Sequence, residues 1–338
     1  MERVSDIGEF GLIERLKRML PQPASVLVSA GDDAAVFRLP SGQIVVATCD
    51  MFMEGVHFEF AACSAWHVGW RAMTASLSDM AAMGCKPLFA TISIGVSHDT
   101  LVDMVEQIYA GLTEAAQAHS VAIVGGDTVR SHGGFVLDVS LVGEPVGSRY
   151  LTRSGGRDGD AIVVTGYPGQ SAAGLAILLS DRKPAGSGEE KLVRAHLEPQ
   201  ARVEQGLFLA DSDFVGAAID LSDGLAQDLG HICEMSELGG LIDLGNLPIS
   251  PYLAEYCDRN SKNPAELCLS GGEDYELLLT VRKDCVEPLM AEWRDRFDIP
   301  ATVIGHMTAE FRGVRVRSGD SVAQRDPTGY DHFRQSSS

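Results

Sequence analysis

The chain has 338 residues, of which 45% are hydrophobic and 22% are charged, and its formal net charge is −20 at pH 7. These proportions are typical of a globular protein and exclude general disorder. The negative charge argues against a nucleic-acid partner, because phosphate backbones are held by lysine and arginine. At this length we expect two domains.

The first half of the chain predicts a β-rich domain of the α/β or α+β type, over residues 1–150. Helices are indicated by hydrophobic residues at helical spacing, and strands by short β-type runs between glycine turns. The expected elements are a helix at 9–20, strands at 25–29, 33–39 and 43–49, a helix between Ser64 and Gly84, a strand at 87–95, a helix at 99–118, and strands at 121–125 and 134–144.

The second half predicts an α/β domain, over residues 151–333, after a polar linker at 152–160. Its strands are expected at 161–166, 215–220, 240–244, 275–281 and 301–308, and its helices at 171–180, 188–196, 200–211, 224–236, 250–257 and 285–297. We expect the tail, 334–338, to be disordered.

Three features bear on the compartment. Seven cysteines without a C-x-x-C pair predict reduced thiols in a cytoplasmic protein. The N-terminal residues include acids and no long apolar run, unlike a signal peptide. Residues 161–180 carry no charge and have the length of a membrane span, but "GYPGQS" interrupts them, so we expect a strand, a loop and a helix, and no membrane partner.

Aspartates recur beside glycines and at the ends of apolar runs. Asp50, Asp127 and Asp220 each end an expected strand, where loops of α/β sheets gather ligands. Asp79 lies within a largely apolar helix, where a carboxylate is costly without a cation or partner. Clusters of oxygen ligands suit Mg²⁺, and several acids imply several ions.

Glycines beside these acids free backbone N–H groups to approach phosphate oxygens, and Ser171 begins a helix whose N-terminus favours anions. The ordinary alternative is that each aspartate caps a turn, that His57 is a polar loop residue, and that Glu273 and Asp274 cap the turn before a strand. Neither a Walker A pattern nor G-x-G-x-x-G occurs. Spacing alone therefore favours a multi-metal phosphate site and leaves simple turn and cap roles open.

Ten blocks in order give a more specific result, because together they resemble the thiamine-monophosphate kinase family over nearly the whole chain. The blocks are "GDDAAV", "TCDMFMEGVHF", "WHVGWRAMTASLSDMAAMG", "GGDTVRS", "LTRSG", "GDAIVVTGYPGQSAAGLAIL", "HLEPQARVEQG", "AIDLSDGLAQDLGHIC", "SGGEDYELLLTV" and "IGHMT".

The resemblance implies an enzyme that transfers the γ-phosphoryl group of ATP to thiamine monophosphate, forming thiamine diphosphate and ADP. It also implies a fold shared with the ATP-binding superfamily of aminoimidazole ribonucleotide synthetase. In that superfamily the N-terminal domains of two subunits pair to make a homodimer, and ATP and several Mg²⁺ ions bind in a cleft between domains.

The resemblance also implies roles for individual positions. The residues that match metal ligands are Asp33, Thr48, Cys49, Asp50, Asp79, Asp127, Asp220 and Asp223. Those that match nucleotide contacts are Tyr109, Gly126, Asp127, Arg153 and Ser222, and those on the thiamine-phosphate side are His57, Glu273 and Tyr330. Cys49 stands where a threonine is usual, and Asp32 is expected to shape the turn before Asp33 or to act through water.

A phosphate acceptor has a second pKa of about 6, so it is largely ionised at neutral pH and needs no general base. What opposes the reaction is repulsion between two anions. We therefore expect Asp50 and Asp127 to act by positioning metal ions, and Arg153 to add positive charge at the ATP phosphates.

Two other interpretations remain. Within the superfamily, selenophosphate synthetase needs a reactive cysteine or selenocysteine near its N-terminus, and the hydrogenase-maturation relative needs a C-terminal cysteine. Neither feature is found here, since the first cysteine is Cys49 and the chain ends "HFRQSSS". From another class, the protein could be a catalytically silent regulator that binds a nucleotide or thiamine phosphate.

Overall fold

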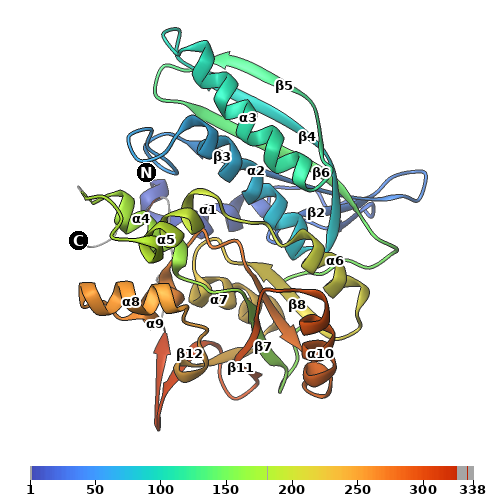
Figure 1. Ribbon diagram of the computed structural model, residues 1–338. Helices are drawn as coiled ribbons and strands as arrows, with labels where there is room; N and C mark the ends of the chain where they lie inside the picture. The colour runs from blue at the N-terminus through green and yellow to red at the C-terminus, as the bar shows by residue number, and fades with distance from the viewer. Residues whose placement is uncertain (1, 181, 326–332, 334–338) are drawn as a thin grey trace.

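The N-terminal part of the protein is a six-stranded sheet with helices on one side. The computed structural model describes residues 2–180, 182–325 and 333, and Figure 1 shows this sheet above a second one. The strand order is β1-β2-β3-β6-β4-β5. The elements are α1 (Val4–Lys17), β1 (Val26–Val28), β2 (Ala35–Arg38), β3 (Ile44–Met53), α2 (Ala65–Ala82), β4 (Cys85–Val96), α3 (Val102–Ala118), β5 (Ala122–Arg130) and β6 (Val136–Pro145).

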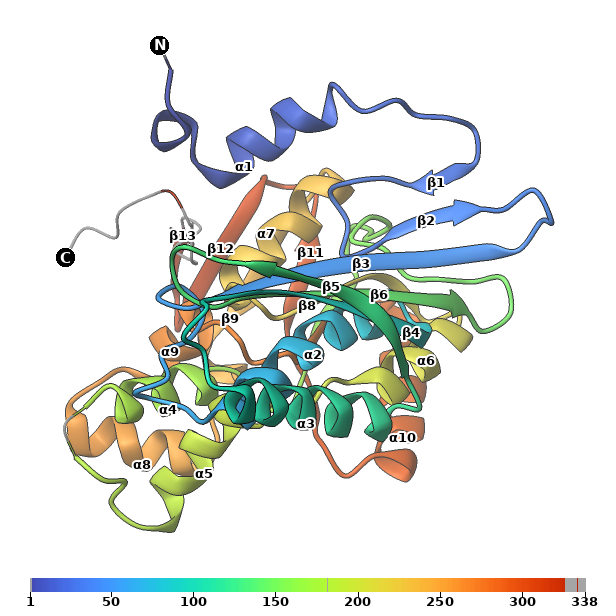
Figure 2. The same cartoon turned by 90° about the horizontal axis from the view of Figure 1, so that it is seen from above.

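The two faces of this sheet differ in burial. Side chains on one face of β4 and β6, such as Ile92 and Val139, are buried beneath α2 and α3, which lie along that side in Figure 2. On the opposite face Met51, Phe89 and Val142 remain exposed. Because strand residues alternate between faces, each strand supplies both a buried and an open surface.

Helices α2 and α3 approach so closely that their backbones touch. Glycines form the contact, since a Cβ atom at Gly69 would lie 1.9 Å from the carbonyl oxygen of Ile108 and one at Gly111 would lie 2.0 Å from that of Trp66. No side chain larger than hydrogen fits at either position while the helices keep this spacing.

We expect Gly69→Ala to destabilise the protein by about 3 kcal/mol, because backbone atoms must move apart to admit the methyl group. The free energy of unfolding in urea measures the effect. Gly230→Ala in the helix at 225–236 is the matched control, because nothing lies within 4 Å of its Cβ position. That control should leave stability unchanged or raise it by up to about 1 kcal/mol, and equal effects of the two substitutions would refute this account of the packing.

The C-terminal part is a seven-stranded mixed sheet in the order β13-β12-β9-β11-β7-β10-β8. Its elements are β7 (Ala161–Thr165), α4 (Gln170–Leu178), α5 (Ser187–Leu197), α6 (Val203–Asp211), β8 (Val215–Asp220), α7 (Leu225–Ser236), β9 (Gly239–Asp243), η1 (Leu244–Asn246), α8 (Pro251–Asn260), α9 (Pro264–Ser270), β10 (Leu277–Val281), η2 (Lys283–Cys285), α10 (Val286–Arg296), β11 (Ala301–Thr308), β12 (Gly313–Ser318) and β13 (Ser321–Arg325).

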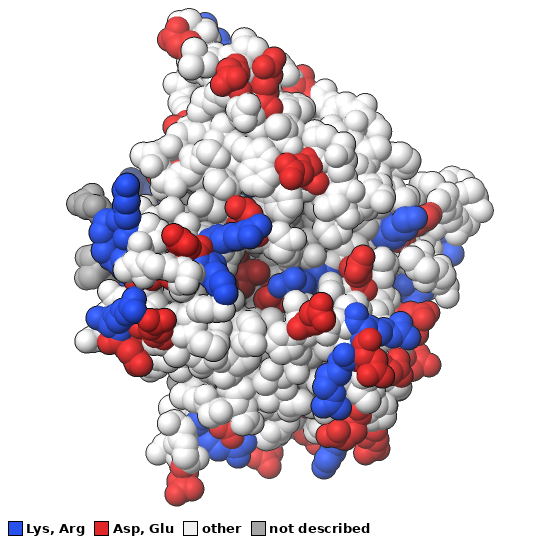
Figure 3. Space-filling model, viewed as in Figure 1, with Lys and Arg blue, Asp and Glu red and all other residues white. Residues whose placement is uncertain are grey.

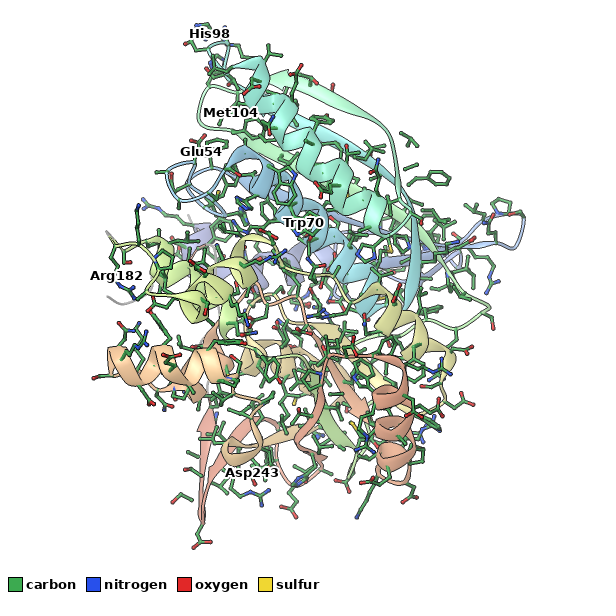
Figure 4. The ribbon with its side chains drawn as sticks, in the orientation of Figure 1. Glu54, Trp70, His98, Met104, Arg182 and Asp243 are labelled. Atoms are coloured by element: carbon green, nitrogen blue, oxygen red, sulfur yellow. The ribbon has the colours of Figure 1, made fainter. Side chains whose placement is uncertain are left out.

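Helix α2 connects the two parts, because its buried residues belong to a core that also contains Ala218 and Leu277 of the second sheet. Trp70, labelled in Figure 4 on α2, donates an indole N–H bond of 2.8 Å to the carbonyl of Pro199. A helix that is buried on several sides explains the apolar composition of this segment, and it carries Asp79 into the junction between the sheets.

The predicted fold class, mixed α/β with two parts, is confirmed. The sequence missed α9, β12 and β13, which are short or lie near the sheet edge, and it ended the strand at 121–125 too early. The uncharged segment 161–180 is β7, a glycine loop and α4, as expected. Across the described residues, no helix has the length and hydropathy needed to cross a membrane.

Candidate active site

A cleft of about 1340 Å³ lies where the two parts of the protein meet. Its walls come from α2, α4, the turn after β8 and the loop before β10. Figure 3 shows acidic and basic side chains facing each other across the middle of the molecule. A cleft of this size and polarity accommodates two small polar ligands side by side.

Three aspartates converge beside the cleft, and two of them, Asp79 and Asp220, line it. The carboxylates of Asp33, Asp79 and Asp220 each offer an oxygen atom, and these atoms all lie within 4.8 Å of one another. Asp33 lies in the turn before β2, Asp79 on α2 and Asp220 at the end of β8, so both sheets contribute. The structure thus brings together residues that are 187 positions apart in the sequence (220 − 33).

Hydroxyl groups orient these carboxylates. Thr48 Oγ1 donates to Asp79, and Ser78 Oγ donates to Asp220 over 2.7 Å. Asp50, on the neighbouring strand β3, accepts a 2.7 Å bond from Ser76 Oγ. The "SLSD" segment of α2 therefore supplies a hydroxyl to two of the acids as well as an acid of its own.

Arg153 closes one side of the cluster. Its Nε and Nη2 atoms donate to Asp33 Oδ1 at 3.1 and 2.5 Å, whereas Asp33 Oδ2 is buried and has no partner among the described residues. Asp32 accepts hydrogen bonds from the backbone N–H groups of Asp33 and Arg153. Asp32 therefore shapes the turn, while Asp33 presents an unsatisfied oxygen atom to the cluster.

Burial and mutual repulsion act on the ionisation of these acids. Burial, followed by repulsion from Asp33, raises the pKa of Asp220 to about 8, and burial raises the pKa of Asp50 to about 6. Burial followed by repulsion from Asp50 and Asp220 raises the pKa of Asp79 well above its ordinary value. Two buried acids, Asp33 and Asp220, and two half-buried acids, Asp50 and Asp79, lie beside one guanidinium, and one carboxylate oxygen is orphaned. Such a donor set fits a site for hard divalent cations.

The metal-free protein should lose stability as the pH rises. An acid whose pKa is higher in the folded than in the unfolded state binds a proton more readily when folded, so stability falls between the two pKa values. For Asp220 this window runs from the ordinary aspartate pKa of 3.8 to about 8. We expect a loss of about 2 kcal/mol between pH 6 and pH 8, and a smaller loss with millimolar Mg²⁺. Urea unfolding with and without EDTA measures it, and Asp220→Asn should remove most of the slope.

A second group of possible ligands lies at the start of α7. One ligand atom from each of Asp223, Asp228 and His231 falls within 4.8 Å of the others. The sequence analysis identified Asp223 and missed the other two, whose spacing of three along a helix was the available signal. Burial lowers the pKa of His231 to about 4, so its imidazole is neutral at physiological pH.

On the other side of the cleft a buried ion pair supports a predicted substrate residue. Arg71 Nη2 donates to Glu273 Oε1 over 2.6 Å and to the carbonyl of His57 over 3.1 Å. His196 lies 3.6 Å from the other oxygen of Glu273. The structure links His57 and Glu273 through Arg71, and it adds Arg71 and His196, which the sequence analysis missed. An arginine within the apolar α2 segment was the signal for the first.

The expected anion site at the start of α4 is already filled, which corrects the prediction for Ser171. The carboxylate of Asp274 accepts hydrogen bonds from the backbone N–H groups of Gly169 and Ser171, at 2.6 and 3.1 Å. The side chain of Ser171 contacts His196 instead, at 3.0 Å. Because a protein carboxylate occupies this helix N-terminus, it is not free to hold a phosphate group.

Asp127 and its neighbours do not join the cluster within one chain. The pairing register across four strands fixes the position of Asp127. Asp127 on β5 pairs with Ser93 on β4, Ser93 pairs with Asp138 on β6, and Asp138 pairs with Met51 on β3. At about 4.8 Å per strand, Asp127 is about 14 Å from β3. It is exposed and shares the open face with Met51, whereas Asp50 points toward α2.

Of the remaining predicted site residues, some line the cleft and others lie away from it. Ser222 and Asp223 line the cleft, whereas Gly126 is exposed on β5 and Tyr109 is half-buried on α3. The Cys49 side chain lies on the open face of the sheet, opposite Ser140, and only its backbone is next to Asp50. Tyr330 lies outside the described residues.

Comparisons with known proteins agree with this architecture. Residues 31–144 match the N-terminal domain, and residues 157–317 the C-terminal domain, of AIR synthase related proteins. Solved structures of the hydrogenase maturation protein HypE share the fold at 18–19% sequence identity, with TM-scores of 0.61 to 0.67. The fold and its acid-lined cleft therefore define a two-domain protein of the AIR synthase related class.

Relatives of higher identity define the group within that class. Thiamine-monophosphate kinases of Escherichia coli K12 and Aquifex aeolicus are 36% and 35% identical, over 96% and 98% of this chain and 98% and 100% of the relatives. A structure described as "AaThiL complexed with AMPPCP and TMP" superposes with a TM-score of 0.87 at 34% identity, covering 98% of this chain and 99% of that one. The chain belongs to the thiamine-monophosphate kinase family.

Proposed function

We propose that this protein is a kinase that transfers the γ-phosphoryl group of ATP to thiamine monophosphate, giving thiamine diphosphate and ADP, the last step in thiamine diphosphate synthesis. The observation that supports this proposal most directly is the convergence of Asp33, Asp79 and Asp220 from the two parts of the protein, with Asp79 and Asp220 lining one cleft. Full-length relatives that bear this activity in their names, and a solved relative whose title includes AMPPCP and TMP, support the substrates.

Several Mg²⁺ ions fit the donor set. Asp33, Asp50, Asp79, Asp220 and Asp223 would hold them, with Thr48 and the backbone of Cys49 as further oxygen donors. The unsatisfied Oδ2 atom of Asp33 is the clearest sign, because burying a lone carboxylate oxygen is costly. When bound, such ions neutralise phosphate charge and align the reacting groups.

The chain's own residues divide into two roles. Arg153, fixed by Asp33, contributes a positive charge beside the acid cluster, where it would face the nucleotide phosphates with Ser222 nearby. His57 and Glu273, joined through Arg71, form the opposite wall and would hold the thiamine phosphate, with Tyr330 as its proposed aromatic contact. No residue is assigned as a general base, because the acceptor phosphate is already ionised at neutral pH.

We further propose that the active protein is a homodimer and that Gly126 and Asp127 act at the site of the partner subunit, whereas Tyr109, on α3, packs against the core on the covered side of the sheet. Asp127 is about three strand spacings from β3 and on the opposite face, so one chain does not unite Asp50 with Asp127. The open face carries exposed Met51, Phe89, Val129 and Val142, which is a surface expected to be covered. Pairing these faces would bring β5 of one copy to β3 of another.

The cytoplasm is the proposed location, because all seven cysteines are free thiols in the structure. Neither nucleic acid nor a membrane is a proposed partner. A catalytically silent regulator of the same architecture is the alternative, and the retained acid cluster favours the enzyme, since buried acids without a ligand cost stability.

Product analysis tests the proposal directly. Purified protein is mixed with ATP, Mg²⁺ and thiamine monophosphate, with free thiamine as a parallel acceptor. Thiamine diphosphate should form only from the monophosphate, and its formation should stop with EDTA. ADP without thiamine diphosphate would assign another acceptor, and ligand binding without ADP release would favour the silent regulator.

A further inference from the structure

A strained segment lies between the acid cluster and the substrate wall of the cleft. Glu273 and Tyr275 have φ values of 59° and 51°, in the left-handed region that side chains other than glycine rarely adopt. Two backbone hydrogen bonds fix this strained conformation. The Glu273 N–H donates to the Ser222 carbonyl at 2.8 Å, and the Tyr275 N–H donates to the Leu221 carbonyl at 2.9 Å. Backbone strain of this kind concentrates where a protein fixes a functional side chain.

The side chain that this strain places is Tyr275. Its residue is 4% exposed and lines the cleft, and its ring belongs to the apolar cluster that connects the two sheets. Its hydroxyl group makes no hydrogen bond to any residue that the structure describes, and its oxygen is not among the fully buried unpaired atoms, so the hydroxyl opens onto the cleft. A tyrosine hydroxyl that faces a cleft without a protein partner is free to donate a hydrogen bond to a ligand.

Tyr275 lies between residues of the substrate wall and residues of the acid cluster. Glu273 is two positions before it, the Tyr275 backbone N–H bonds to the carbonyl of Leu221, next to Asp220, and Tyr275 lines the same cleft as Arg71 and Asp50. Burial raises the pKa of Tyr275 well above its ordinary value, so the phenol keeps its proton. The group at this junction is therefore a neutral O–H donor.

We propose that Tyr275 is a catalytic residue whose hydroxyl donates a hydrogen bond to an oxygen of the phosphoryl group in transfer. This inference rests on the proposed function. The junction between the acid cluster and the Glu273–Arg71 pair is where donor and acceptor phosphates must meet, and negative charge spreads over the equatorial oxygens there. The tyrosine keeps its proton throughout, so no bond to it forms or breaks. A donor fixed by a strained backbone does not need to reorganise during the reaction.

Tyr275→Phe tests the assignment, because it removes one hydroxyl and keeps the ring. We expect kcat to fall about 10- to 100-fold, with KM for ATP and for thiamine monophosphate changed by less than about threefold. Tyr256→Phe is the matched control, since Tyr256 is also 4% exposed but lies on α8, outside the cleft lining. The control should keep wild-type kcat, and both variants should unfold at similar urea concentrations.

Three results would overturn the assignment. The first is a kcat for Tyr275→Phe within about twofold of the control. The second is an activity loss that matches a loss of folded protein in urea. The third is a Glu273→Gln/Tyr275→Phe double variant no slower than Glu273→Gln alone, which would make Tyr275 a positioning residue for Glu273. Analysis of the wild-type product separates these three results from failure of the proposed function. If the true acceptor is another molecule, the wild-type product will differ from thiamine diphosphate, and the kcat values of the variants can still be compared with that acceptor.

Discussion

Asp79→Asn is expected to lower kcat by at least about a thousandfold while it makes the metal-free protein more stable. Asp79 is the member of the acid cluster that α2 carries into the junction, with its carboxylate within 4.8 Å of those of Asp33 and Asp220. An amide of the same shape keeps the packing and the Thr48 contact but loses the charge that would hold a divalent cation. Loss of charge stabilisation at a phosphoryl-transfer site typically costs several powers of ten in rate.

The expected gain in stability of Asp79→Asn without metal follows from the same charges whose loss lowers kcat. At an effective dielectric constant of about 20, two unit charges 4.8 Å apart repel by roughly 3 kcal/mol. The folded protein relieves this by holding a proton on Asp79, whose pKa is raised by burial and then by Asp50 and Asp220. Asparagine removes that requirement, so we expect a gain on the order of 1–2 kcal/mol at pH 8.

Urea unfolding in EDTA and in Mg²⁺, together with steady-state kinetics, measures both effects. Wild-type protein should gain stability from Mg²⁺, and Asp79→Asn should gain much less. Asp99→Asn, at an exposed position beside His98, is the control and should leave both quantities unchanged. A variant that keeps its kcat, or that is less stable than wild type in EDTA, would contradict the proposed role of Asp79.

Local sequence patterns determined most of this fold. The helix from Ser64 to Gly84 was predictable because its N-cap, its apolar positions and its final glycine all agree, and the structure has Ser64 accepting the expected cap bond from the His67 N–H. Strand β12 pairs with β9 and alternates valine and arginine from Val314 to Arg317, a strand signal that the sequence analysis did not use. Strand β13 pairs with β12 at the sheet edge and is short, mostly polar and mostly exposed, so it gives little signal.

The site was less accessible to sequence reasoning, for a physical reason. Asp79 could be singled out because a carboxylate in an apolar helix needs a partner. Asp274 could not be distinguished from a turn cap, since its partners are N–H groups 103 and 105 residues away. Tyr275 resembles an ordinary core tyrosine until the left-handed backbone and its unpaired hydroxyl group are seen.

Asp127 differs again, because its proposed role depends on a surface that one chain does not contain. The register across β5, β4, β6 and β3 puts it on the open face, away from Asp50. If Asp127 acts at all, it acts where another copy of the chain brings an acid cluster to that face. This geometry makes a strong prediction about mixtures of inactive variants.

Asp127→Asn and Asp79→Asn should each be nearly inactive alone and should recover activity when mixed. In a mixed dimer, the cluster of the Asp127→Asn chain is intact and receives Asp127 from the Asp79→Asn chain, so one of its two sites is complete. Random exchange makes half of the dimers mixed, so activity should rise to roughly a quarter of the wild-type value. Co-refolding from urea at equal concentrations, followed by measurement of thiamine diphosphate formation, tests this.

The control separates shared sites from simple recovery of folding. A mixture of Asp79→Asn with Asp220→Asn should stay inactive. Each substitution damages the acid cluster of the chain that carries it, so no arrangement of subunits yields a complete site. Restoration in the first mixture alone requires that Asp127 serve the partner's cluster. No restoration in either mixture, with dimers verified by sedimentation, would mean that each site is built within one chain.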